Sequence, residues 1–226
     1  MTCIEGWTSC NGFFLLILSM LAIAFNLTPL IADYVEDQRL LYSPISCYEW
    51  WLPGMVGGGL LVLPGVAMSL AARRKGSCNS RCGMLTSAVL SLLVILGAAY
   101  CTIISLFAID RGPLICDTGT HDVNNCDYTL GNFSSFENIR FDLSWFQNTT
   151  CLETNNPDDL SNGIMRERLL DLEIDENTQK IIHIVVFVAL AIIGLLEALV
   201  GIFQIVAGVF GFICGTSKRR DDDDDD

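Results

Sequence analysis

The chain has 226 residues, of which 51% are hydrophobic and only 17% are charged. Its mean hydropathy of +0.46 exceeds that of ordinary water-soluble domains, so the composition indicates a membrane protein. The formal net charge is −13, but part of it comes from the acidic run at residues 221–226. No basic stripe with interleaved aromatic residues is present in the sequence, which argues against a nucleic-acid partner.

Four apolar stretches are each long enough to cross a bilayer as a helix, which takes about 20 residues. They lie at residues 11–32, 52–72, 84–109 and 181–215. The segment 1–10 before the first stretch has no Lys or Arg, and no convincing small-residue cleavage site is found, so we expect a retained signal-anchor helix. The sequence predicts an all-α membrane protein, a four-helix transmembrane bundle with a small disulfide-linked extracellular domain.

Basic residues near helix ends predict the orientation, because they are held on the cytosolic side. The segment 73–83 contains basic residues and no acidic one, and residues 218–220 read KRR. We therefore expect residues 1–10, 73–83 and 216–226 in the cytosol, and the segments 33–51 and 110–180 outside. Glu5 is the only charged residue before the first stretch, so an inverted topology stays open as an alternative.

The segment 110–180 exceeds ordinary connection lengths, so we expect either a small domain, which we favour, or a largely disordered flap. A helix is expected over residues 165–172 and a turn-rich loop over 155–162. A modest core is expected from apolar residues: Leu143, Trp145, Phe146, Leu169, Leu170 and Leu172. N-glycosylation sequons begin at Asn132 and Asn148, and we expect at least one to be used. The same pattern at Asn26 lies inside the first span and is expected to stay unmodified.

The placement of the ten cysteines separates nine of them into two groups and leaves Cys101 by itself. Four fall in the predicted outer segments: Cys47, Cys116, Cys126 and Cys151. An oxidising compartment favours two disulfides among them, with three connectivities open, against the alternative of free buried thiols. Five lie at or near cytosolic helix ends: Cys3, Cys10, Cys78, Cys82 and Cys214. Juxtamembrane thiols are commonly S-acylated, and unmodified thiols are an equal alternative. A zinc site is not expected, because no histidine accompanies these cysteines and their spacings fit no standard zinc finger. Cys101, inside the third span, is expected to be a packing residue.

The fourth stretch carries glycines and polar residues at alternating spacings of three and four: Gly194, Glu197, Gly201, Gln204, Gly208, Gly211 and Gly215. These residues share one helix face, where small residues allow helices to approach closely and polar side chains find partners. We prefer this helix-packing role for Glu197 over an ion or proton pathway, which usually needs several ionisable groups. In the second stretch, Pro53 is expected at the start of the helix and Pro64 is expected to bend it.

In the first stretch, Gly12, Ser19 and Asn26 repeat every seven residues on one side of the helix. Depth counted from the cytosolic ends places Asn26 level with Glu197, and Ser19 level with Gln204. We therefore predict that the first and fourth helices pack antiparallel, with hydrogen bonding between Asn26 and Glu197.

No catalytic motif is found: HExxH and GxSxG are absent from the sequence, and the glycines at 57–59 lack the Lys of a phosphate-binding loop. His121 and His183 are isolated, and we expect both to be solvated. The sequence thus predicts neither catalytic activity nor a cofactor or metal.

Three motifs carry a family resemblance. Residues 46–51 read SCYEWW ahead of Pro53 and Gly54, residues 112–116 read GPLIC, and the fourth stretch ends at Cys214 and Gly215. Up to Arg220, the chain resembles the four-span L-six antigen family. That family is tetraspanin-like in topology, but this sequence lacks the Cys-Cys-Gly motif of true tetraspanins.

The resemblance implies a non-enzymatic adaptor in the plasma membrane or endoplasmic reticulum membrane that organises other integral membrane proteins. We expect it to bind them, or a second copy of itself, through the small-residue helix faces. The alternative is a channel or transporter subunit that uses Glu197.

Overall fold

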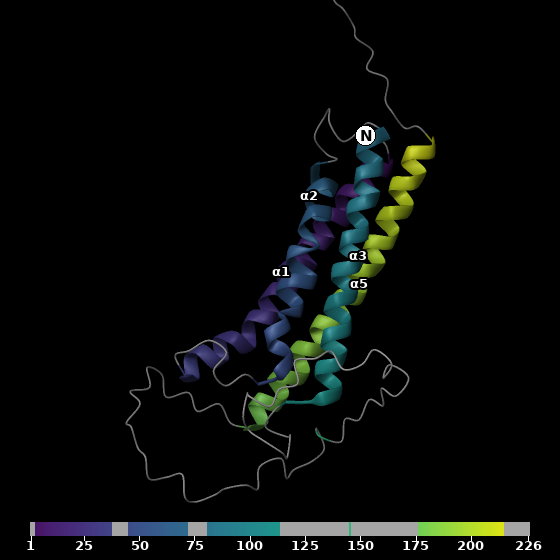
Figure 1. The fold of residues 1–226 in the computed structure, drawn as a ribbon. Helices are drawn as coiled ribbons and strands as arrows, with labels where there is room; N and C mark the ends of the chain where they lie inside the picture. Colours follow the sequence, from purple (N-terminus) through teal and green to yellow (C-terminus); the bar gives the residue numbers. More distant parts are fainter. Residues whose placement is uncertain (1–2, 38–44, 72–80, 114–144, 146–175, 215–226) are drawn as a thin grey trace, which may run out of the picture.

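The computed structural model describes residues 3–37, 45–71, 81–113, 145 and 176–214. The described elements are all helical: α1 (Cys3–Asp37), η1 (Cys47–Trp51), η2 (Pro53–Leu60), α2 (Leu63–Ala71), α3 (Arg81–Arg111) and α5 (Glu176–Cys214). Figure 1 shows an elongated bundle in which the start of α1 and the end of α5 lie at the same end. We call it the terminal end, and the opposite one the loop end.

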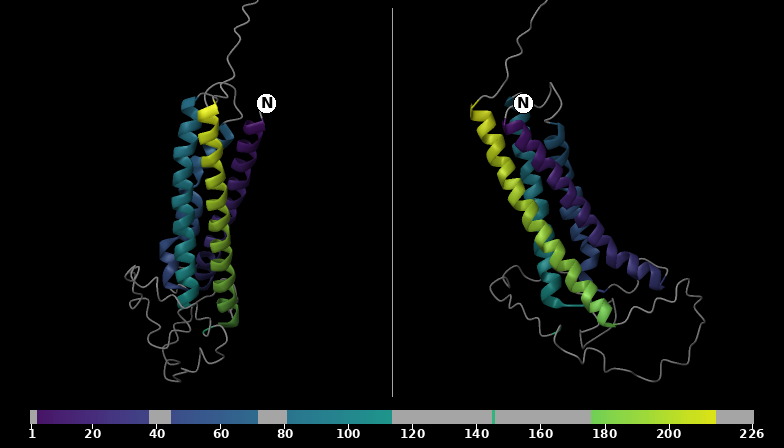
Figure 2. Two further views of the ribbon diagram at one scale, coloured as in Figure 1. Left: turned by 90° about the vertical axis from the view of Figure 1, so that its right-hand side faces the viewer. Right: turned by 180° about the vertical axis from the view of Figure 1, so that it is seen from behind.

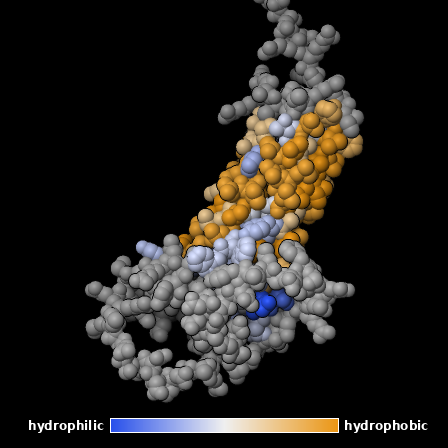
Figure 3. All heavy atoms as spheres, in the orientation of Figure 1, coloured by the Kyte–Doolittle hydropathy of each residue, from blue (hydrophilic) through white to orange (hydrophobic). Residues whose placement is uncertain are grey.

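Four helical segments are long and apolar enough to cross a membrane: Trp7–Ile31, Cys47–Ala71, Leu85–Arg111 and Thr178–Phe210. They confirm the predicted fold class of an all-α protein with four spans, whereas the disulfide-linked outer domain stays a prediction. On the face drawn in Figure 3, apolar side chains cover most of the shaft of the bundle, and large exposed hydrophobic side chains occur on all four spans. A continuous exposed apolar surface of this kind is what a lipid environment requires.

The second span is not one continuous α-helix. Ser46 opens η1 with a capping box, in which its backbone N–H donates to Glu49 Oε1 at 3.1 Å and its hydroxyl accepts from the N–H of Tyr48. Leu52, with φ +43°, then turns the chain into η2, a π-helix that begins at Pro53 as expected. A turn at residues 61–62 separates η2 from α2. It falls just before Pro64, which has no N–H and whose ring clashes with the preceding helical turn.

The spans pack closely because glycines line their contacts. Helix α3 lies against α5 over its length (Figure 2), while η2 contacts α1, α3 and α5. A Cβ atom added to Gly57 would lie 2.7 Å from the carbonyl oxygen of Gly97, which shows how near the backbones of η2 and α3 come. Two buried apolar clusters fill the interior, one around Phe187 and Leu190 and the other around Leu15, Val62 and Val94.

Candidate functional site

Polar side chains of the spans are concentrated inside the bundle. The buried ones that lie well inside the spans are Ser19, Asn26, Ser69, Ser91, Ser105, Glu197 and Gln204. The hydroxyls of Ser69, Ser91 and Ser105 each donate to a carbonyl one turn earlier in their own helix, at 2.7, 2.8 and 2.7 Å. Those three are satisfied locally. The candidate site therefore rests on the other four, which come from α1 and α5.

Asn26 of α1 holds the start of the second span. Its Oδ1 accepts hydrogen bonds from the backbone N–H groups of Gly54 at 2.6 Å and Met55 at 3.1 Å. The first N–H groups of a helix have no partner within it, so a side chain from a neighbouring helix can cap them. The predicted hydrogen bond between Asn26 and Glu197 is wrong, because this amide caps η2 and both carboxyl oxygens of Glu197 lack a hydrogen-bond partner.

Gln204 of α5 also pairs with the second span. Its Nε2 donates to the hydroxyl oxygen of Ser69 in α2. Ser19, which we expected at the level of Gln204, does not bond to it, and the Ser19 hydroxyl is buried without a hydrogen-bond partner. Helices α1 and α5 run antiparallel and contact each other, as predicted. Counting residues from the helix ends did not predict the hydrogen-bond partners of their polar groups. The glycine-rich second span contacts both helices, and Asn26 and Gln204 bond to it instead of to each other's helix.

Glu197 is fully buried and lies against the glycines of η2. A Cβ atom on Gly58 would lie 3.5 Å from Glu197 Oε2 and 2.6 Å from Cβ of Ala22. The carboxyl is thus near the level of Ala22, one helical turn away from Asn26. On the α3 side lies Cys101, a buried free thiol whose Sγ contacts the carbonyl oxygen of Leu190 at 3.6 Å. The helix-packing role preferred for Glu197 from sequence stays a prediction: the side chain is buried against η2, but its carboxyl oxygens have no hydrogen-bond partner.

The small-residue face of α5 is used within the chain. A Cβ atom on Gly194 would lie 2.9 Å from the carbonyl oxygen of Ala98, and one on Gly201 would lie 2.9 Å from the side chain of Ile95, so both glycines face α3. Gly208 is buried as well. These glycines are therefore not open to a partner protein, contrary to the expected mode of lateral binding.

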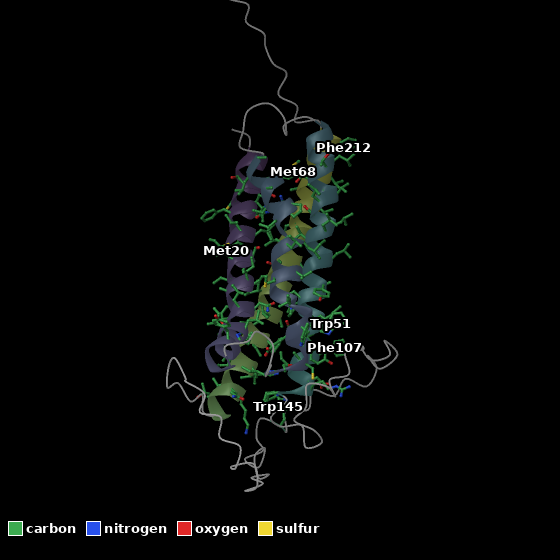
Figure 4. All side chains as sticks on the ribbon, turned by 60° about the vertical axis from the view of Figure 1, so that its left-hand side comes forward. Met20, Trp51, Met68, Phe107, Trp145 and Phe212 are labelled. Atoms are coloured by element: carbon green, nitrogen blue, oxygen red, sulfur yellow. The ribbon has the colours of Figure 1, made fainter. Side chains whose placement is uncertain are left out.

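Trp145 and His183 form a cluster at the loop end that sequence analysis missed. Trp145 Nε1–H donates to the carbonyl oxygen of Ile109 at 3.1 Å, and its ring stacks on His183 with centroids 5.5 Å apart. His183 also meets Phe187 edge-on at 4.8 Å and is 1% exposed, so the expectation of a solvated histidine is wrong. Figure 4 shows Trp145 at the loop end, opposite Met68 and Phe212. The sequence did contain an indication of this burial, because His183 lies seven residues before Leu190 and fourteen before Glu197, which places all three on one face of the helix.

Most predicted modification sites fall outside the described side chains. Cys10 is an exposed free thiol on α1. The structure gives no side-chain description of Cys3, Cys82 and Cys214, and it does not describe Cys78, Cys116, Cys126, Cys151, Asn132, Asn148 or the helix expected over 165–172. The disulfides, glycans and S-acylation remain predictions. Among the described residues, no group of three or more His, Cys, Asp or Glu side chains is placed to hold a metal ion.

Comparison with known proteins places these features in a family. The family model described as L6 membrane protein matches residues 2–218. Transmembrane 4 L6 family member 20 of Homo sapiens is 43% identical over 97% of this chain and 98% of its own length, and its Mus musculus counterpart is 43% identical over the same shares. Transmembrane 4 L6 family member 5 of Homo sapiens is 33% identical over 49% of this chain and 58% of its own length. No solved structure matches. This chain is a multi-pass membrane protein that belongs to the L6 membrane protein family.

Proposed function

We propose that this protein is a non-enzymatic membrane organiser that binds other integral membrane proteins laterally, in the plasma membrane or the endoplasmic reticulum membrane. The observation that carries the proposal is the outward face of α5, where Leu195, Leu199 and Phe203 are 57%, 52% and 56% exposed. These side chains recur every four residues and form a ridge that fits the groove of a partner helix. Because the glycines of α5 are engaged by α3, this ridge replaces the small-residue face as the binding surface.

Proximity labelling in intact cells tests this proposal. The ridge variant carries Leu195→Ala, Leu199→Ala and Phe203→Ala, and a matched control on the outward face of α3 carries Val89→Ala, Leu92→Ala and Leu96→Ala. All six side chains are exposed, so neither variant opens a cavity in the core. We expect the ridge variant to lose a defined set of labelled membrane proteins that the control retains. Equal labelling by wild type and both variants would contradict the adaptor role.

A channel or transporter subunit is the second candidate, favoured by one observation. Glu197 is an intramembrane acid that is fully buried and makes no hydrogen bond, and such residues mark ion or proton pathways in membrane proteins. Reconstitution into liposomes with a flux assay separates the two functions. Proton or ion flux that disappears in Glu197→Gln would establish transport, whereas no flux above that of protein-free liposomes would exclude it.

A further inference from the structure

We propose that Glu197 and the glycine segment of η2 form a proton-binding site within the bundle, and that the bound proton keeps η2 packed against α1 and α5. This inference depends on neither function proposed above. The proton is a resident ligand, which does not have to cross the membrane. Its loss changes how the second span packs.

The carboxyl group of Glu197 lies against a glycine of η2. Gly58 faces Glu197, and a Cβ atom added to this glycine would lie 3.5 Å and 3.7 Å from the two carboxyl oxygens. On either side, a Cβ atom on Gly57 would meet the backbone of α3 and one on Gly59 would meet the side chain of Ile23. At Gly58 the second span offers the carboxyl no side chain, and neither carboxyl oxygen has a hydrogen-bond partner.

The neighbouring groups determine which ligand fits. Helix α1 presents Ala22 at this level, η2 presents Gly58, and α3 presents the thiol of Cys101. Among the described residues, the thiol of Cys101 is close enough to interact electrostatically with the carboxyl, and no described cation acts on it. Metal cations such as Ca²⁺ require several oxygen ligands, which this enclosure does not provide. A proton needs only the carboxyl oxygen itself, so the structure favours a proton as the ligand.

Release of the proton would leave a carboxylate in apolar surroundings without a compensating charge, which is strongly unfavourable. The element expected to respond is η2, because its glycines at residues 57–59 contribute no side chain of their own to the contacts with Cys101, Ala22 and Ile23. It is also a π-helix, a rare geometry that is frequently found at functional sites. Movement of η2 would uncover Cys101, since a Cβ atom on Gly57 would lie only 2.9 Å from Cβ of Cys101.

Infrared spectroscopy of the full chain in lipid nanodiscs tests the bound proton directly. A carboxylic-acid C=O band is expected at neutral pH in the wild type, and its difference from Glu197→Gln should contain that band. Glu49→Gln removes the other described buried acid, whose Oε1 accepts the N–H of Ser46, and should leave the band in place. Glu197→Asp keeps an acid at the site and should shift the band without removing it. Identical carboxylic-acid regions in wild type and Glu197→Gln would overturn the proposal.

Thiol labelling of Cys101 tests the link to packing. A membrane-permeant maleimide is applied at increasing pH, and modified peptides are quantified by mass spectrometry, with exposed Cys10 as the internal reference. Thiol reactivity rises with pH in every variant, so the informative quantity is the excess in wild type over Glu197→Gln, which cannot ionise. We expect labelling of Cys101 in wild type to rise several-fold more steeply. Superimposable pH profiles would show that the proton does not control the packing of η2.

Discussion

At the scale of single residues, two buried polar side chains of the first and fourth spans find their partners on the second span. Asn26 meets the free N–H groups at the start of η2, and Gln204 meets a serine on the same span. In an apolar medium an unpaired backbone N–H is costly, so a cap supplied by another helix both satisfies it and fixes the position of that helix. Asn26 is therefore a registration point between the first two spans.

Asn26→Ala should weaken the bundle, because it removes two hydrogen bonds and leaves the N–H groups of Gly54 and Met55 buried without an acceptor. Hydrogen bonds in membrane proteins average about 0.6 kcal/mol, so we expect a loss of roughly 1–3 kcal/mol in the free energy of unfolding. Denaturation by increasing mole fraction of a harsh detergent measures it. Thr28→Ala is the control, since Thr28 is exposed and bonds only to Ala24 of its own helix. Equal stability of the two variants would contradict the capping role.

Sequence periodicity identified the inward residues at this scale but not their partners. The heptad spacing of Ser19 and Asn26 placed them on one face of the first helix, and both are buried. Their hydrogen bonds depend on how far the second span enters the bundle. That depth is set by backbone approach at Gly54, Gly57 and Gly58, which no residue count along α1 or α5 contains.

At the scale of elements, hydropathy located four spans but could not show that the second is composite. The apolar run 52–72 has the composition of one helix, whereas the structure divides it into η2 and α2 with a turn at residues 61–62. Pro64 indicated the break. The sequence did not predict the π-helical geometry of η2, whose glycines lie in tight contact with α1, α3 and α5.

Gly97→Ala should destabilise the contact between α3 and η2. The added Cβ atom would meet the carbonyl oxygen of Gly57 and Cβ of Leu61, both too close for a real contact, so the helices must separate. Overpacking of this kind typically costs about 1–3 kcal/mol. Ala99→Val adds more volume to the same helix at an exposed position and serves as the control. Unfolding in detergent compares the two variants, and a stable Gly97→Ala would mean that η2 is not held by backbone approach.

At the scale of the whole molecule, the positions of the helix ends bear on orientation in the membrane. The start of α1, the end of α2, the start of α3 and the end of α5 all lie at the terminal end (Figure 1). In the sequence, the basic residues at 73–75 and 218–220 begin within four residues of two of these helix ends. One orientation therefore satisfies the positive-inside rule for both clusters, with the terminal end in the cytosol. The loop end, where Trp145 joins the long segment 114–175 to α3 and α5, would then face the lumen or the cell exterior.

Glycosylation reports this orientation, because the modifying enzyme acts only in the secretory lumen. We expect glycan at Asn132 or Asn148 when the full chain is made in mammalian cells, seen as a glycosidase-sensitive shift on a gel that is lost in the double variant Asn132→Gln and Asn148→Gln. Asn26→Gln is the matched control, since Asn26 opens a third sequon but is buried in α1 with its amide oxygen bonded to Gly54 and Met55. That variant should leave the shift unchanged. A shift that depends on Asn26 would contradict the buried position of this residue. The absence of any shift in the wild type would count against use of the outer sequons. It would favour the inverted orientation, in which the segment 110–180 remains in the cytosol.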